Sequence, residues 1–424
     1  MGCGSIIKGG FSLHKSETYW ARAEGSIFSL VQLYQEGSGN HVKGNYPRFI
    51  QRGSHGHIWD VDGNEYVDYD MGLGPIILGY CYEAVNQAVM DQLQLGTHFS
   101  LVSPGEVEYA ELVIENIPCA EKVRFLKTGS SATEAAVRIA RAYTGRSHII
   151  RGEYHGWHEW TIAGEGYRQG GIISEARQYI HMCRYNDLSS FEKLFHQHKG
   201  EIAAVIIEPL IIQKPKNDFL KNLLDLCHAE GALLIFDEVV TGFRFHLGGA
   251  QKYLGITPDL ATFGKAAANG LPLSFVTGKK EIMDAVDKDV YLFTTFGGER
   301  LSLAAGIAVI NELKNRDVND RIWSLGGRLK KETNALTERL GLDISLEGSH
   351  PRLMFNFKGS NDQYRRQMKN TFMQECIKRG VFLGWTIFPC YTHTDADIDL
   401  TMNVFEDAMK VCKQYKDSVR AWGG

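Results

Sequence analysis

The chain has 424 residues, of which 44% are apolar and 23% charged, and its 46 basic and 50 acidic side chains give a net charge of −4. This composition is typical of globular proteins with two or three domains, and it offers no basic surface for nucleic acid. No apolar run approaches the roughly 20 residues that cross a membrane, the first residues lack a secretory signal pattern, and the eight cysteines form no Cys-x-x-Cys pair. We therefore expect a cytoplasmic protein with reduced thiols and no metal site.

The N-terminal part of the chain predicts helices and one β-hairpin. The hairpin is indicated by alternating apolar and polar residues on both sides of an Asp62-Gly63-Asn64 turn. The helices are indicated by apolar residues at helical spacing. In chain order, the predicted elements are a helix at 16–23, hairpin strands at 58–61 and 65–69, and helices at 83–95 and 106–116.

The middle of the chain alternates between short apolar runs and helical patterns. Such alternation predicts an α/β fold, in which a mostly parallel sheet carries helices on both faces. The predicted strands lie at 123–126, 148–151, 203–207, 233–236 and 274–277.

Beyond residue 320 the pattern changes to a long amphipathic helix at 322–340, short strands at 353–357 and 381–383, and a final helix at 398–415. We read this part as a small α+β domain. The predicted organisation is a large domain at 56–315 and a small domain at 316–424 that is joined by the N-terminal segment 1–55.

The buried run at 233–236 ends in Asp237 and Glu238. Open α/β sheets bind ligands at the carboxyl ends of their strands, and alternation turns Glu238 away from Asp237. Lys265 follows 28 positions after Asp237, within a stretch of small and apolar residues. Loss of hydration there favours a neutral, nucleophilic amine, as in a Schiff-base lysine. An Asp that faces a pyridinium nitrogen is the usual companion of such a lysine, although each feature alone also fits an ordinary strand end or loop.

A second chemical feature is the Gly-Ser-Ser-Ala-Thr turn at 129–133, which leads from a strand into a helix. Helix N-termini bind phosphate through free N–H groups and the positive end of the dipole. The alternative is purely structural: Ser131 caps the helix and Glu134 reaches back to it. Both roles are compatible.

Three further residues lie where a ligand would bind. Tyr154 follows a predicted strand, where its ring can stack on a planar cofactor or fill the core. Glu208 ends the strand at 203–207. Thr295 lies in a Thr-Phe-Gly-Gly turn, which alone is also a plain helix start.

In this order, these parts resemble the class III aminotransferases of PLP (pyridoxal 5′-phosphate) fold type I, in particular glutamate-1-semialdehyde aminomutases and the related sugar aminotransferases. The resemblance covers about residues 20–415. It rests on Ser131-Ala-Thr-Glu-Ala, Tyr154-His-Gly, Glu208-Pro, Asp237-Glu-Val-Val-Thr-Gly-Phe-Arg244, Phe263-Gly-Lys265 and Thr295-Phe-Gly-Gly.

The resemblance implies a role for each matching residue. Lys265 is the Schiff-base lysine that also moves the substrate's proton, and Asp237 keeps the pyridine nitrogen protonated. Val239 and Tyr154 pack on the two faces of the ring, and Glu208 lies on the substrate side. The phosphate is bound by Ser131, Ala132 and Thr133, and by Thr295 of the neighbouring subunit in a homodimer.

Three departures from the aminomutases bear on the substrate. Gln32 stands where those enzymes carry a carboxylate-binding arginine, Leu73 replaces a tryptophan, and the stretch 385–393 lacks their gating glutamate. A neutral amide cannot replace a bidentate guanidinium. We therefore expect an aminotransferase that moves an amino group from glutamate to an aldehyde or ketone of an oxidised sugar or of a similar hydroxylated carbonyl compound, with a role in amino sugar synthesis.

Other functions remain open at this stage. The alternatives are the aminomutase reaction itself, an ω-amino acid transaminase, and a PLP-fold binding protein without catalysis, which the intact Lys265 argues against. A nicotinamide dehydrogenase would need a Gly-x-Gly-x-x-Gly fingerprint, which the sequence lacks. Arg244 and His155 either contact substrate or have only structural roles.

Overall fold

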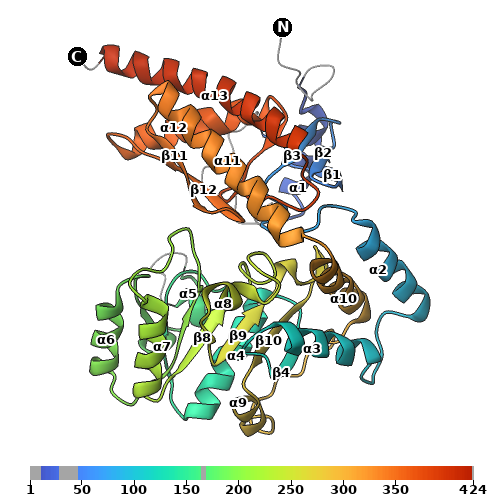
Figure 1. Cartoon of the computed structure of the whole chain (residues 1–424), viewed down its shortest axis with the longest axis vertical. Helices are drawn as coiled ribbons and strands as arrows, with labels where there is room; N and C mark the ends of the chain where they lie inside the picture. Colours follow the sequence, from blue (N-terminus) through green and yellow to red (C-terminus); the bar gives the residue numbers. More distant parts are fainter. Residues whose placement is uncertain (1–10, 28–45, 164–168, 423–424) are drawn as a thin grey trace. The chain divides into compact units, whose positions relative to one another are not determined.

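The computed structural model describes residues 11–27, 46–163 and 169–422, which divide into two compact units (Figure 1). The first unit contains the described residues up to Tyr82 and those from Asp320 onward, and the second runs from Glu83 to Asn319. These boundaries differ from the expected ones after residues 55 and 315. The reason is long-range pairing, because Val67 of the hairpin lies opposite Val381 in a parallel ladder that ties the hairpin to the C-terminal part.

The second unit is built on a seven-stranded sheet, which confirms the α/β prediction. Strands β5 to β9 are parallel to one another, and β10 is antiparallel to both of its neighbours, β9 and β4. In spatial order the strands are β4 (Lys122–Leu126), β10 (Ser274–Gly278), β9 (Leu260–Phe263), β8 (Leu233–Asp237), β7 (Ile202–Ile207), β5 (His148–Arg151) and β6 (Ile180–Met182).

The central strands are buried because both faces of the sheet are covered. Every residue of β7 and β8 is buried. Val276 of β10 belongs to the core cluster that includes the alanines of α4 (Gly129–Thr144). Its neighbour Phe275 points the other way and stacks on Phe263 and the edge of Tyr109, which belongs to α3 (Pro104–Asn116). Because side chains alternate along the strand, β10 contributes residues to the packed layers on both faces of the sheet.

The remaining elements of this unit surround the sheet (Figure 1). The long α10 packs against α2, α3 and the short 3-10 helix η3. The elements are α2 (Glu83–Leu95), α5 (Glu159–Ile162), η2 (Ser174–Tyr179), α6 (Leu188–Gln197), α7 (Phe219–Ala229), α8 (Gly249–Leu254), η3 (Lys265–Ala268), α9 (Lys280–Ala285) and α10 (Arg300–Asn315).

The first unit is an α+β assembly with its own core. Its four-stranded sheet has the order β1 (Ile50–Ser54), β2 (His57–Asp60), β3 (Glu65–Asp68) and β13 (Val381–Phe382). A separate hairpin and four helices complete it: β11 (Ile344–Ser349), β12 (Arg352–Phe357), α1 (His14–Glu24), α11 (Val318–Leu340), α12 (Asp362–Ile377) and α13 (Asp395–Trp422). Leu329, Phe372 and Phe405 are among its buried core residues. None of the described helices is long and apolar enough to cross a membrane.

Candidate active site

Three segments that are far apart in the sequence meet at the carboxyl ends of the central strands. Val239 lies two residues beyond β8, and a Cβ atom added to Gly129 at the start of α4 would lie 2.8 Å from its Cγ1. A Cβ atom on Gly264 would lie 3.5 Å from the same methyl group and 3.8 Å from the Cα of Gly129. Because Gly264 directly precedes Lys265, the lysine turn, the end of β8 and the start of α4 belong to one site.

The carboxylate of Asp237 is buried and held by three donors. Its Oδ1 accepts hydrogen bonds from the backbone N–H of Val239 at 3.0 Å and from the hydroxyl of Thr262 at 3.2 Å. Its Oδ2 lies 2.7 Å from Nδ1 of His155. A buried polar group is costly unless it is hydrogen-bonded, and both oxygens of this carboxylate have hydrogen-bond partners. Asp237 is therefore fixed in position at the ligand edge of the sheet.

His155 is the site residue that sequence reasoning left open. Its ring is buried, and Nε2 has no hydrogen-bond partner among the described residues. The indole of Trp160 lies nearly parallel to the imidazole, with the ring centroids 6.4 Å apart. The ring therefore has one polar contact that the described residues define, the one with Asp237. The only signal in the sequence was the position of His155 next to Tyr154.

The loop after β5 is fixed on the first turn of α4. The hydroxyl of Thr133 donates to the carbonyl of His155 at 2.7 Å, and the N–H of Trp157 donates to Oγ of Ser130 at 3.2 Å. Gly156 has a φ of 109°, and a Cβ atom there would lie 2.5 Å from Oγ of Ser130. Glycine is required at this close approach. Thr133, which we expect to take part in phosphate binding, thus also holds the histidine loop through its hydroxyl.

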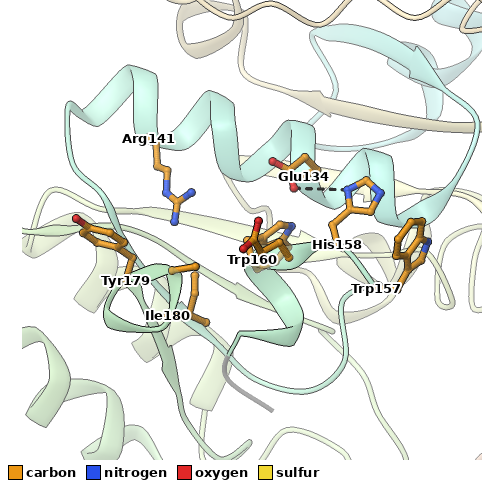
Figure 2. Close-up of a pocket in the computed structure, with 9 residues that line it drawn as sticks. Glu134, Arg141, Trp157, His158, Trp160, Tyr179 and Ile180 are labelled. Carbon is orange, nitrogen blue, oxygen red and sulfur yellow. Dashed lines mark ion pairs between the residues drawn. The ribbon is translucent and has the colours of Figure 1, made fainter. Parts of the chain in front are cut away.

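The start of α4 differs from the capping pattern that the sequence predicts. Thr128 is the N-cap, and its Oγ1 accepts a hydrogen bond from the N–H of Ser131 at 3.1 Å. Glu134 instead forms an ion pair with His158 at 3.5 Å, which Figure 2 shows. The first N–H groups of a helix have no intrahelical partner and lie at the positive end of its dipole. The turn at 129–131 therefore suits an anionic group.

Lys265 opens η3 in a left-handed backbone conformation, with a φ of 42°. A residue with a side chain is strained there, and such strain gathers at functional sites, where the surrounding structure holds it. The lysine is partly buried, while the alanines that follow it are fully buried. The end of β9 and the packed alanines therefore fix the backbone that carries the amine.

The other predicted site residues differ in burial. Glu208 directly follows β7 and is buried, whereas the ring of Tyr154 is 60% exposed. Arg244 is fully buried, and Asn319 donates to its carbonyl at 3.1 Å. Thr295 is exposed in the loop between α9 and α10, and no described contact joins it to the lysine turn.

Glu238 points away from the site, as the alternation along the strand indicates. Its carboxylate accepts hydrogen bonds from the hydroxyl of Thr241 at 2.8 Å and from the backbone N–H of Gln251 at 3.0 Å. Burial raises the pKa of Glu238, and these donors oppose that effect. Its role is to anchor the start of α8, so Asp237 is the carboxylate available to a ligand.

The geometry fits the chemistry of PLP. Within the second unit it brings together a fixed carboxylate, a partly buried lysine, an exposed aromatic ring and a helix N-terminus with close backbone approach at Gly129. These are the groups that hold a protonated pyridine nitrogen, an aldehyde, a flat ring and a phosphate.

Comparison with known proteins supports this reading. The family model for class III aminotransferases matches residues 38–409. A 3-aminobutyryl-CoA aminotransferase of Cloacimonas acidaminovorans is 35% identical, over 88% of this chain and 92% of the relative. A glutamate-1-semialdehyde 2,1-aminomutase of Acetivibrio thermocellus is 36% identical, over 92% of this chain and 96% of the relative.

Solved structures show the same fold. The PLP-containing FumI protein of Sphingopyxis sp. MTA144 superposes with a TM-score of 0.88 at 28% identity, over 96% of this chain and 98% of that one. An omega-transaminase from Sphaerobacter thermophilus gives a TM-score of 0.86 at 24% identity, over 95% and 100%, and so shows the fold alone. The chain therefore belongs to the class III aminotransferases of PLP fold type I, and it is a PLP-dependent aminotransferase.

Proposed function

We propose that the enzyme transfers an amino group from glutamate to the aldehyde or ketone of an oxidised sugar, or of a similar hydroxylated carbonyl compound. The observation that carries this proposal is Gln32, which lies outside the described residues and stands where the resemblance places an arginine in the aminomutases. Leu73 and the absence of an acid from 385–393 point the same way. The neutral side-chain amide of glutamine is better suited to bind the hydroxyl groups of a substrate than to bind a substrate carboxylate.

In this proposal each residue has a defined task. PLP, when bound, supplies an electron sink for the substrate carbanion. Asp237, oriented by His155, holds the proton on the ring nitrogen. Lys265 removes a proton from the substrate carbon and returns it. The backbone at Ser131 and Ala132 binds the phosphate, while Val239 and Tyr154 cover the two ring faces and Glu208 lies on the substrate side.

The proposal includes a homodimer in which Thr295 serves the partner's site. Its support is an exposed apolar surface on the second unit, formed by two segments of the chain. Arg300 N–H donates to the carbonyl of Thr97 at 3.0 Å, and the rings of His98 and Phe296 lie 5.3 Å apart, so the segments contact one another. The apolar surface consists of Phe99, Leu101, Val102, Tyr291, Phe293 and Phe296, all exposed.

Exposed apolar patches of this kind mark interaction sites, and the loop that carries Thr295 contributes half of this one. A cytoplasmic location is also part of the proposal. It agrees with the seven free cysteines among the described residues, six of which are buried.

A second candidate is the aminomutase reaction or an ω-amino acid transamination. It is favoured by the relatives, since several aminomutases are 33–36% identical over at least 87% of the chain. The 3-aminobutyryl-CoA aminotransferase relative is named for a substrate whose amine is on carbon 3 of an acyl-CoA thioester, and so is not an α-amino group. The two candidates differ in whether the acceptor brings its own carboxylate to the position of Gln32.

The first experiment is to record the visible spectrum of the PLP-loaded enzyme before and after addition of glutamate. We expect the yellow band to be lost, and Lys265→Ala to show no such change. A yellow enzyme that glutamate leaves unchanged would exclude glutamate as the donor, and other amino acids would then be tested in its place.

The acceptor is tested by adding carbonyl compounds to the enzyme after glutamate has converted it. Recovery of the yellow band with keto- or aldehydo-sugars, but not with the semialdehyde, supports the proposal. The reverse result rejects the sugar proposal and favours the aminomutase. Gln32→Arg provides a matched variant, because it should shift the preference toward the acceptor that carries a carboxylate.

A further inference from the structure

Three histidines lie together at the end of the sheet opposite the candidate active site. His148 begins β5, where it pairs with Ile202 at the start of β7, and His181 is the middle residue of the edge strand β6. His198 follows directly after α6. One ring nitrogen of each histidine lies within 4.8 Å of the others, and all three side chains are partly buried. Asp237, in contrast, is at the carboxyl end of β8, so the two sites are distinct.

The three rings form a compact, partly buried group. Nδ1 of His148 lies 2.8 Å from Nε2 of His181, and the ring of His198 lies 4.7 and 4.2 Å from those of His148 and His181. Burial, followed by the neighbouring His198 and His148, lowers the pKa of His181 to about 4. Burial and His198 also lower the pKa of His148. Neutral imidazoles carry the lone pairs that metal ions bind, with little competition from protons near pH 7.

The carboxylate of Glu201 lies close to two of the three imidazole rings. Oε2 of Glu201 lies 3.2 Å from Nδ1 of His198 and 3.7 Å from Nε2 of His148. Histidines that bind metals nearly always donate their second ring N–H to a carboxylate or carbonyl, which fixes the tautomer and the ring orientation. Glu201 therefore leaves Nδ1 of His148 and Nε2 of His198 for a ligand. It also offsets the positive charge of Arg141, which acts on His148.

We propose that His148, His181 and His198 bind one divalent transition-metal ion, Zn²⁺ above all, with Glu201 as the outer carboxylate. Nδ1 of His148, Nε2 of His181 and Nε2 of His198 are the ligand atoms, and water fills the fourth position of a tetrahedron. Binding widens the 2.8 Å separation of the first two nitrogens to about 3.3 Å, the spacing that follows from Zn–N bonds of about 2.05 Å. The rings turn about their Cβ–Cγ bonds, which are soft.

The metal would act on the fold and not on amino transfer. It would join β5, the three-residue edge strand β6 and the end of α6. The backbone already links β5 to β6 through their ladder, and it links β5 to the segment after α6 through the N–H of His148, which donates to the carbonyl of Glu201 at 3.1 Å. Tyr179, whose ring meets that of His148 edge-on at 5.3 Å, also lines a cavity of about 450 Å³ together with Ile180 and Arg141 (Figure 2). The sequence predicts no metal site because its cysteines form no Cys-x-x-Cys pair, and these histidines are 33 and 17 positions apart (181 − 148 and 198 − 181), so they form no local motif either.

The test is titration of the PLP-loaded enzyme with Zn²⁺ by calorimetry, and with Co²⁺ by visible spectroscopy. We expect one ion per chain and the intense visible bands of tetrahedral Co²⁺. His198→Gln should weaken binding by more than about 100-fold, and Glu201→Gln by about 10- to 100-fold. The matched control is His196→Gln, an exposed histidine two positions away in α6, which should bind as the unchanged enzyme does.

Two results would overturn the proposal: no saturable binding of one ion per chain, or equal affinities for the His198→Gln, His181→Gln and His196→Gln variants. The second result would place the ion at another site, such as the thiols or PLP, which all variants share. Zn²⁺ should also raise the melting temperature of the enzyme but not that of His198→Gln. The glutamate spectrum of each variant verifies its fold and keeps this test separate from the proposed amino transfer.

Discussion

The pairing of Asp237 with His155 gives the site a defined electrostatic arrangement. The buried carboxylate has three donors, and one of them is an imidazole that has no other hydrogen-bond partner among the described residues. These donors fix the orientation of the carboxylate, which has to face the pyridine nitrogen to hold a proton there. His155 thus acts through Asp237, as a positioning residue.

We predict that His155→Phe slows the glutamate half-reaction by about 10- to 100-fold, since a hydrogen bond to a charged group contributes about 1.5–3 kcal/mol. Stopped-flow loss of the yellow band measures this rate. His155→Gln, which retains a donor, should recover part of it. His158→Phe is the control, because His158 faces Glu134. Equal losses in both Phe variants would mean that the loop as a whole, and not the bond to Asp237, sets the rate.

At the scale of elements, the start of α4 links fold stability to cofactor binding. Thr128 caps the helix that we propose binds the phosphate. Thr128→Ala should lower the free energy of unfolding of the PLP-free protein by about 1 kcal/mol, which urea denaturation measures. It should also weaken PLP binding, which a spectroscopic titration measures. Thr128→Ser keeps the cap and should leave both values nearly unchanged. A loss of stability with unchanged PLP affinity would argue that the phosphate binds elsewhere.

The sequence predicts elements that have a clear pattern of apolar residues, and it misses some short strands that have none. The helix predicted at 83–95 and the strand predicted at 148–151 agree with α2 and β5. Strands β6 and β9 were not predicted, because they have three and four residues and become strands only by pairing with neighbours. Periodicity also could not show that Thr128 caps α4 three residues before Ser131.

The candidate site shows the same division between local and long-range information. Lys265 and Asp237 stand at recognisable strand ends, so they were found from local patterns. The contact between His155 and Asp237 joins positions 82 residues apart, and the metal cluster brings together three separate segments. Only the folded chain reveals such contacts, because the histidines have no distinctive neighbourhood in the sequence.

A buried histidine in the first unit predicts a pH dependence of stability. His393 stacks on Tyr69 at 4.7 Å, and its Nδ1 accepts a hydrogen bond from the N–H of Cys390, which requires the neutral ring. Burial lowers the pKa of His393 to about 4. The unfolded chain therefore takes up a proton below about pH 6.5, while the folded chain does so only near pH 4. Stability should fall as the pH drops through this window.

The expected loss between pH 7.5 and 4.5 is about 2–3 kcal/mol from this group. Urea unfolding at the two pH values measures it. In the non-titrating variant His393→Asn, the loss of stability between these two pH values should be smaller than in the unchanged protein by about this amount. The comparison with the variant is needed because the neighbouring His57 has the opposite effect on stability. Burial lowers the pKa of His57, but Asp397 and Glu65 outweigh burial and raise it. His57 therefore stabilises the folded protein more as the pH falls. An equal pH dependence in both proteins would contradict the assignment.

At the scale of the whole molecule, we expect the apolar surface that includes Leu101 and Phe293 to be covered by a second chain. Leu101 is 83% exposed, which is unusual for a leucine amid five other exposed apolar side chains. If this surface joins two chains, Leu101→Glu buries a charge at the interface and should convert dimer to monomer. Light scattering after size exclusion measures the mass. Ile173→Glu is the control, because Ile173 is also exposed but lies outside this surface.

A mixing experiment tests whether Thr295 serves the neighbouring chain. Thr295→Ala and Lys265→Ala should each be nearly inactive as homodimers, the first through loss of a phosphate contact and the second through loss of the amine. In a heterodimer, one site combines the intact Lys265 of one chain with the intact Thr295 of the other. Random reassociation of equal amounts makes half of the dimers mixed, so about a quarter of all sites should be intact. Activity should therefore rise to about a quarter of that of the unchanged enzyme after the chains are unfolded together and refolded with PLP. If Thr295 instead contacts the phosphate of its own chain, no site in the mixture is intact, and activity stays at the level of the separate variants.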